Sequence, residues 1–171
     1  VITVPNDAFV FLQQYPQIFD VIISDLPDPT NESLARLYSR EFFKLVKKRL
    51  APNGVFVTQA SSPFHTTKAY WCINENIKSA GFQHTYPYHA YVPSFGDWCF
   101  IMANDSGIDT AQFDLGVETS FLSEKTMQRL FHFEKDLEVD TVKISTLDQP
   151  VLLDYYLEEW RRWARLNIER Q

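Results

Sequence analysis

The chain has 171 residues, which is enough for one domain or for one domain with a small appendage. Hydrophobic residues make up 45% of it and charged residues 22%, as in ordinary globular proteins, and the net charge of −6 argues against nucleic acid as a partner. The sequence has no apolar run of about eighteen residues, so no membrane span is predicted. Its two cysteines lack the spacing of a disulfide framework or a metal site, and we expect a reducing, cytoplasmic compartment.

The first predicted elements are short. Residues 1–4 predict a strand, and residues 8–14 predict a helix with Asp7 as its N-cap. The chain opens on Val1 without a start methionine, and it contains no glycine-rich turn between a strand and a helix. We therefore expect it to be an excised portion of a longer protein.

The most informative segment follows at residues 19–29. Its β-branched apolar run at 21–23 predicts a buried parallel strand over 19–24. Asp25 and Asp28 come after this strand, and open α/β sheets bind ligands beyond the carboxyl ends of such strands. Two carboxylates three positions apart favour a cationic ligand, for which a polyamine is the obvious candidate.

A long helix is predicted over residues 32–50. Apolar residues recur there with helical spacing: Leu34, Leu37, Tyr38, Phe42, Leu45, Val46 and Leu50. Pro52-Asn53-Gly54 is expected to end this helix and turn the chain. The β-branched and aromatic residues 55–58 then predict a strand that places Gln59 at its tip.

The next predicted elements are a helix over 67–80 that stops at Gly81, and two strands over 82–91 and 98–103. The connector between the two strands is short, which implies an antiparallel pair. Strands and helices alternate up to this point. The order therefore predicts the later portion of a doubly wound α/β sheet with an antiparallel hairpin at its end.

Beyond residue 105 the pattern changes to isolated helices, predicted from the Ser123 cap to 131 and over 150–166. We therefore divide the chain into a partial α/β domain over 1–105, which lacks a glycine-rich nucleotide loop, and a C-terminal helical extension over 106–171.

These motifs together resemble the polyamine aminopropyltransferases, the spermidine synthase family, and especially its bacterial branch in which membrane spans precede the catalytic domain. The matching pieces run through nearly the whole chain: Asp25-Leu26-Pro27-Asp28-Pro29, Leu37-Tyr38-Ser39, Phe42-Phe43, residues 54–60, 91–98 and 147–152, and Tyr155-Tyr156. The resemblance implies a Rossmann-like, methyltransferase-type fold. It implies transfer of an aminopropyl group from decarboxylated S-adenosylmethionine, as co-substrate, to a diamine such as putrescine, without a metal or prosthetic group.

The resemblance also implies residue roles. Asp25 acts on the attacking amine, Asp28 helps to hold the amine, and Asp7 with Ala8 lies against the adenine of the donor. The chemistry agrees, because an alkylamine with a pKa of roughly 10.4 is mostly protonated at neutral pH, and an adjacent carboxylate can accept a proton and orient the lone pair. Neutral hydrogen bonds from a strand tip and an aromatic wall around the methylene chain complete the expected amine site: Gln59, Tyr91, Phe95 and Trp98.

The chain departs from the family pattern in two ways. The glycine-rich loop, a ribose-binding acid and an early tyrosine of the amine site are expected before Val1. The isolated chain is therefore expected to bind the donor poorly and to be inactive. Spermidine synthases usually carry tyrosine where this chain has Phe95, which removes a hydroxyl that could orient the amine.

Each candidate residue also has a purely structural interpretation. Asp28 before a proline can begin a turn, Asp25 can cap the next helix, and Asp7 can be a plain N-cap. Tyr38 lies on the apolar stripe of its helix, which favours core packing, although its hydroxyl could reach the cleft. Strand-end and loop residues can likewise be ordinary buried residues: Gln59, Phe95 and Trp98.

Two other functions stay open. An S-adenosylmethionine-dependent methyltransferase would have a similar sheet, but a methyl acceptor seldom needs two anionic anchors. A non-catalytic polyamine-binding domain of a membrane protein fits the acidic balance and Phe95. A second copy of the chain and an N-terminal membrane domain stay open as partners, whereas nucleic acid and metal ions are not expected.

Overall fold

The computed structural model describes residues 1–139 and 141–168. Its elements follow in the order α1 (Ala8–Gln14), β1 (Phe19–Ser24), α2 (Glu32–Ala35), α3 (Arg40–Lys48), β2 (Leu50–Gln59), α4 (Thr67–Ser79), β3 (His84–Val92), β4 (Gly96–Asn104), α5 (Glu124–Leu130) and α6 (Val151–Ile168). Short 3-10 turns lie at Arg36–Tyr38 and Lys135–Leu137.

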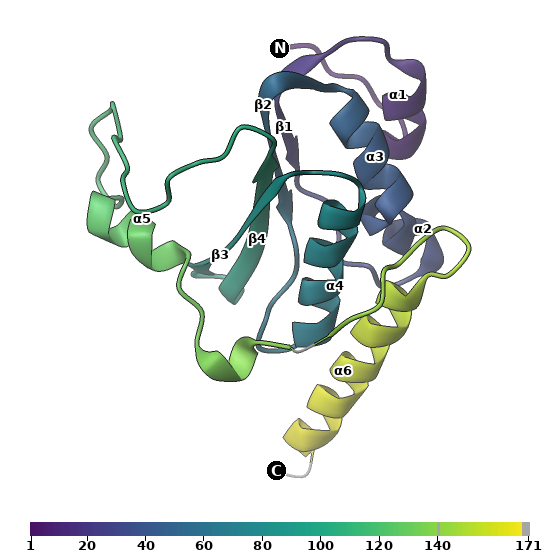
Figure 1. Cartoon of the computed structure of the whole chain (residues 1–171). Coiled ribbons are helices and arrows are strands. Elements are labelled where there is room, and N and C mark those ends of the chain that lie inside the picture. Colours follow the sequence, from purple (N-terminus) through teal and green to yellow (C-terminus); the bar gives the residue numbers. More distant parts are fainter. Residues whose placement is uncertain (140, 169–171) are drawn as a thin grey trace.

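The described residues form a four-stranded sheet in the order β1-β2-β4-β3. Strands β1 and β2 are parallel, and β4 runs antiparallel to both β2 and β3. Helices α1, α3 and α4 cover one side of the sheet, whereas α5 lies on the other side (Figure 1). The predicted parallel pair and terminal antiparallel hairpin are therefore confirmed.

The N-terminal segment agrees only in part with its prediction. Asp7 caps α1 by accepting hydrogen bonds from the backbone N–H groups of Phe9 and Val10, as expected. The strand predicted over residues 1–4 is wrong, and these residues lie exposed as coil. A strand needs a neighbour for its backbone hydrogen bonds, and among the described residues no strand lies beside this segment.

Strand β1 forms where it was predicted and is parallel to β2, but it is not buried on both faces. Val21 is 56% exposed and Ile23 is 74% exposed, while Ile22 is half-buried against the core. Within the described residues β1 pairs with β2 alone, so it is one of the two edge strands of this sheet. The continuous apolar run therefore predicted the strand correctly, but the prediction that this strand is buried is wrong.

The long helix predicted over 32–50 is also wrong, because the chain breaks at Ser39. Ser39 has extended backbone angles, and its side chain caps α3 by accepting a hydrogen bond from the Phe42 N–H. The Ser39 hydroxyl also donates to the carbonyl of Arg36 at 2.7 Å. Serine therefore closes one helical turn and starts the next helix.

The turn predicted at Pro52-Asn53-Gly54 is wrong, because these residues lie within β2. The pairing register shifts here, since Phe19 lies opposite Leu50 whereas Val21 lies opposite Val55. The extra residues are absorbed as an irregularity of the strand pair. A Cβ at Gly54 would lie 2.9 Å from the carbonyl oxygen of Asp20, so the close approach of the two strands requires glycine.

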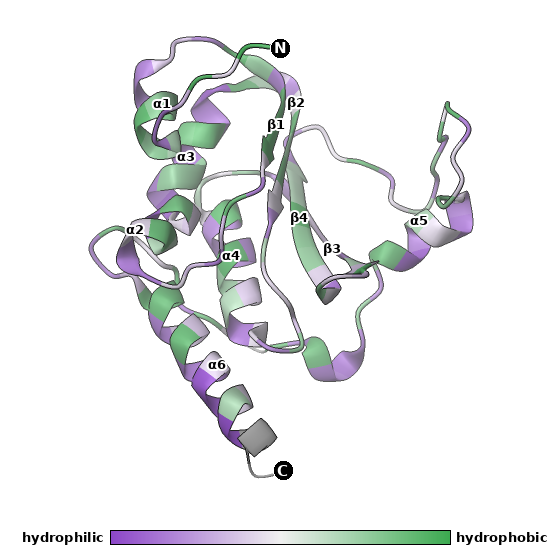
Figure 2. Ribbon diagram, turned by 180° about the vertical axis from the view of Figure 1, so that it is seen from behind, coloured by the Kyte–Doolittle hydropathy of each residue, from purple (hydrophilic) through white to green (hydrophobic). Residues whose placement is uncertain are grey.

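Helix α6 packs along α4 and joins the main core (Figure 1). Leu152 and Tyr156 belong to the same buried cluster as the aromatic residues Phe43 and Phe56. Hydrophilic residues gather toward the C-terminal end of α6 (Figure 2). The division of the chain at residue 105 stays a prediction. No helix within residues 1–139 and 141–168 is both long and apolar enough to cross a membrane.

Candidate active site

The two predicted acids lie on the loop that leaves β1, and this loop is fixed by a buried tyrosine. The hydroxyl of Tyr38 donates toward the backbone carbonyls of Leu26 and Pro27, both at 3.0 Å. Tyr38 is fully buried, and burial, with the nearby charge of Asp28, raises its pKa so that the hydroxyl stays protonated. Tyr38 is therefore both a core residue and an anchor of the acidic loop.

Asp28 is half-buried, and protein donors hold its carboxylate. Its Oδ2 accepts hydrogen bonds from the Tyr156 hydroxyl at 3.0 Å and from the Ser61 hydroxyl at 3.1 Å. Its Oδ1 accepts a longer bond, 3.3 Å, from the Gln59 amide. Asp25, in contrast, is exposed, so the two acids occupy different surroundings at the same sheet edge.

Gln59 is the last residue of β2, as predicted, and it links several parts of the site. Its amide donates to the Leu26 carbonyl and to the Tyr38 hydroxyl, both at 2.5 Å. Its side-chain oxygen accepts from the Ser61 backbone N–H at 2.8 Å and from the Trp98 indole at 3.2 Å. Because Gln59 is only 5% exposed and its amide is used within the protein, it shapes the site more than it offers free hydrogen bonds.

Ser61 has a strained backbone conformation, with φ of 67°. A left-handed conformation at a residue other than glycine costs on the order of 1–3 kcal/mol and persists only where several contacts impose it. The backbone contacts here are the Ser61 N–H to Gln59 and the Ser61 carbonyl, which accepts from the Cys99 N–H at 2.8 Å. These contacts place the Ser61 hydroxyl against Asp28.

A cavity of about 490 Å³ opens beside these groups. Its lining includes most of the predicted amine site: Asp25, Asp28, Gln59, Phe95 and Trp98. The rings of Phe95 and Trp98 are tilted against each other with centroids 5.3 Å apart. Tyr91 is not part of this lining, because it lies near the end of β3 with its side chain 71% exposed.

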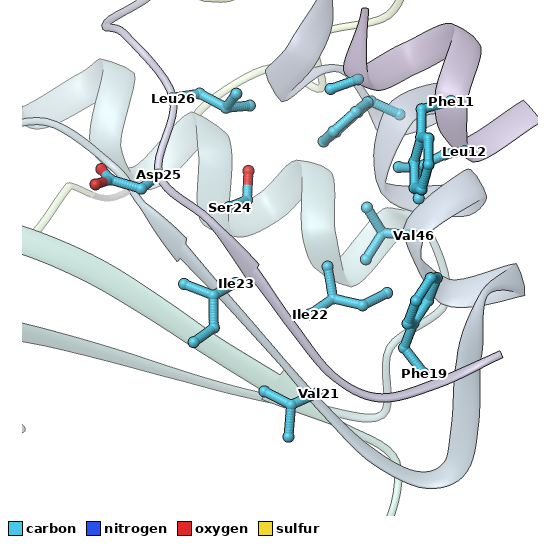
Figure 3. Close-up of a pocket in the computed structure, with 12 residues that line it drawn as sticks. Phe11, Leu12, Phe19, Val21, Ile22, Ile23, Ser24, Asp25, Leu26 and Val46 are labelled. Carbon is cyan, nitrogen blue, oxygen red and sulfur yellow. The ribbon is translucent and has the colours of Figure 1, made fainter. Parts of the chain in front are cut away.

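A second cavity, of about 380 Å³, lies between α1 and β1 (Figure 3). It is largely apolar, and Ala8 contributes to its wall. Figure 3 shows Ile22 directed toward Val46, whereas the Asp25 carboxylate points away from that apolar group. Asp25 and Leu26 line both cavities, so Asp25 stands at the boundary between them.

Asp7 lines neither cavity. It caps α1 and pairs with the Arg36 guanidinium. The hydrogen bond that the Val10 N–H donates to Asp7, together with the charge of Arg36, lowers the pKa of this carboxyl. The N-cap prediction is confirmed, and the adenine contact of Asp7 and Ala8 stays a prediction.

Two residues of this site were missed by the sequence analysis, namely Ser61 and Tyr156. Both hold Asp28 from distant parts of the chain, and no local pattern points to that contact. Among residues 1–139 and 141–168, no cluster of three or more histidine, cysteine or acidic side chains is arranged to hold a metal ion.

Comparisons with known proteins identify the family of this chain. Residues 1–114 match the spermine/spermidine synthase domain family. The polyamine aminopropyltransferase of Leptospira interrogans is 40% identical over 162 residues, which cover 94% of this chain and 32% of that protein. The corresponding enzyme of Oceanobacillus iheyensis is 40% identical over 161 residues, covering 92% of this chain and 31% of that protein. The chain thus spans about a third of the length of these relatives.

Solved structures show the same fold. A spermidine synthase crystallised with the transition-state analogue AdoDATO aligns with a TM-score of 0.66 at 23% identity, over 76% of this chain and 47% of that one. The spermidine synthase of Thermotoga maritima aligns with a TM-score of 0.65 at 22% identity, over 77% of this chain and 46% of that one. The predicted Rossmann-like, methyltransferase-type fold is therefore confirmed.

Proposed function

Because the chain belongs to the spermine/spermidine synthase family, we propose that it carries the amine-binding side of an aminopropyltransferase site. The donor is decarboxylated S-adenosylmethionine, and the acceptor is a diamine such as putrescine. The amine nitrogen forms a bond to the aminopropyl carbon as the bond from that carbon to the sulfonium sulfur breaks, so the sulfur leaves as a neutral thioether. The proton lost by the amine passes to Asp25.

The position of Asp25 is the observation that carries this proposal. The cavity beside Asp28 is called the acidic cavity here, and the cavity between α1 and β1 is called the apolar cavity. Asp25 lines both, so its carboxylate lies where a donor in the apolar cavity and an amine in the acidic cavity would meet. Roughly one alkylamine in a few thousand is neutral at pH 7, because its pKa is about 10.4. A carboxylate at the junction can accept the proton and orient the lone pair toward the reacting carbon.

The wall of the acidic cavity suits an alkylammonium chain. Phe95 and Trp98 supply apolar surface for methylene groups, and Asp28 supplies a fixed negative charge for the far ammonium. A cation over the face of Trp98 would add roughly 0.5–2 kcal/mol of attraction. Pairing of two copies, a membrane domain ahead of this chain and a cytoplasmic location stay predictions from the sequence.

The test uses the protein at its natural length with putrescine and decarboxylated S-adenosylmethionine, and it measures spermidine and methylthioadenosine. Asp25→Asn should lower kcat by about 10²–10⁴-fold, since it removes the proton acceptor. Asp20→Asn is the matched control, because Asp20 is an exposed acid near the other end of β1. Unchanged turnover in Asp25→Asn would refute the role of Asp25.

The rival functions give different products. A protein that methylates the amine with S-adenosylmethionine, and does not use the decarboxylated donor, would be a methyltransferase. A protein that binds putrescine or spermidine and alkylates neither would be a binding domain. Either result would overturn the proposed activity.

A further inference from the structure

Helix α6 meets the rest of the molecule along one face. Leu152 is fully buried in the core, the Tyr156 hydroxyl reaches Asp28, and the Glu159 carboxylate accepts from the backbone N–H groups at the start of α4, at 2.9 and 3.2 Å. Positions four and three residues apart share one face of a helix. The rotation of α6 is therefore fixed by contacts on both sides of Tyr156.

Tyr156 is the donor in its bond to Asp28. Its side chain is 5% exposed, and burial together with the Asp28 charge raises its pKa, so the hydroxyl keeps its proton. A hydrogen bond from a neutral hydroxyl to a carboxylate is among the stronger ones in proteins. The ring also packs edge-on against Trp160, with centroids 6.2 Å apart. The hydroxyl is therefore held against Oδ2 of Asp28 by packing on its own helix.

The bonds to Asp28 leave little freedom for its carboxylate. A carboxylate offers about four acceptor positions, and Tyr156 and Ser61 occupy two of them, both on Oδ2. The Gln59 amide lies 3.3 Å from Oδ1, but its two hydrogens serve the shorter bonds to Leu26 and Tyr38. Asp28 lines the acidic cavity, whereas Tyr156 and Ser61 do not. Tyr156 therefore holds Oδ2 from the side away from the cavity, and Oδ1 is left for a ligand in the cavity.

We propose that Tyr156 is a positioning residue that orients Asp28 toward the distal ammonium of the amine, so that α6 completes the amine site. This inference rests on the proposed function. It extends the site beyond residues 1–114, which are the residues that the spermine/spermidine synthase domain covers. Asp25 has no contact with Tyr156 through this network, so the group at the reacting nitrogen is not disturbed when the hydroxyl is removed.

The test compares Tyr156→Phe with Tyr155→Phe at natural length. The first variant keeps the ring, its packing and the Leu152 and Glu159 contacts, and removes only the hydroxyl on Asp28. The second removes the neighbouring hydroxyl, which accepts from the Lys143 N–H at 3.3 Å. Tyr156→Phe should raise the KM for putrescine by about tenfold with kcat within about twofold of the parent, because a bond to a charged group is lost at the amine anchor only. Tyr155→Phe should leave that KM unchanged.

A double-mutant cycle separates positioning from a general loosening of α6. In an Asp28→Asn background, Tyr156→Phe should have less than about a twofold further effect, since the carboxylate that it positions is absent. Equal effects of Tyr156→Phe in both backgrounds, or a parental KM in the single variant, would overturn this proposal while leaving Asp25 chemistry intact.

The dissociation constant of putrescine, measured by calorimetry without the donor, distinguishes the two proposals. A protein that binds putrescine without alkylating it, and binds it about tenfold more weakly after Tyr156→Phe, would refute the proposed activity and support the role of Tyr156. A protein that neither alkylates nor binds a diamine would refute both.

Discussion

A buried amide on α4 joins the 3-10 turn at Arg36–Tyr38 to the segment that precedes α6, and its removal should destabilise the protein strongly. Asn76 is fully buried. Its amide nitrogen donates to the Tyr38 carbonyl at 2.9 Å, and its oxygen accepts from the Ser145 backbone N–H at 2.7 Å. Asn76→Ala would leave both of those buried backbone groups without this partner.

The same helix offers a matched control. Asn74 is only 1% exposed, yet its amide makes one long bond, 3.4 Å, to Glu75, and its side-chain oxygen has no partner. Each buried polar group that loses its partner costs about 1–3 kcal/mol, so Asn76→Ala should lower the free energy of unfolding by about 2–6 kcal/mol. Asn74→Ala removes the same atoms and gains the same helix propensity, but it should cost at least about 2 kcal/mol less, because no strong bond is lost.

The measurement is urea unfolding of the parent chain and the two variants, followed by circular dichroism and tryptophan fluorescence. Coincident transitions from the two signals would justify a two-state free energy of unfolding. Equal losses in the two variants, within about 0.5 kcal/mol, would refute the reasoning, because burial of the amide and not its bonds would then set the cost.

Two further predictions concern titratable groups. The Val10 N–H and the Arg36 charge lower the pKa of Asp7, so its contribution to stability is present above the ordinary carboxyl pKa and is lost as the pH falls through the lowered value. Asp7→Asn keeps the N-cap, so its free energy of unfolding should lie below that of the parent near about pH 6 and converge with it as the pH falls below the lowered pKa of Asp7; a gap that persists in acid would contradict the role of the charge. Burial raises the pKa of the Cys72 thiol to about 12 and also raises that of Cys99, and both side chains are fully buried. Neither thiol should react with iodoacetamide at about pH 8 in the folded chain, and both should react in urea, as read by mass spectrometry; rapid labelling without urea would show that the core is more open than described.

Local signals predicted the elements that depend on local contacts. The cap at Asp7, the helix stop at Gly81 and the short connector of the hairpin each act within a few residues, and all three are confirmed. Asp25 and Asp28 line one cavity. The sequence pointed to this position, because both acids follow the carboxyl end of a parallel strand, where open α/β sheets bind ligands.

The failures occur where distant contacts override a local pattern. The apolar stripe over 32–50 is real, but the chain breaks at Ser39 because the polar groups of Tyr38, just before the break, have partners elsewhere. The Tyr38 hydroxyl bonds the loop after β1, and the Tyr38 carbonyl bonds Asn76 of α4. Similarly, the apolar run of β1 could not reveal that Val21 and Ile23 face outward at the sheet edge.

The orientation of Asp28 is a stronger case of the same limit. Its donors Ser61 and Tyr156 lie 33 and 128 residues away along the chain. The helix predicted over 150–166 includes Tyr156, but its sequence does not say which surface of the protein this residue meets. The docking of α6 is fixed by Leu152, which is buried in the core, and by Glu159, which accepts hydrogen bonds from the first turn of α4. This docking places the Tyr156 hydroxyl against Asp28. The local motif thus predicts the presence of Asp28, whereas the orientation of its carboxylate depends on how α6 docks.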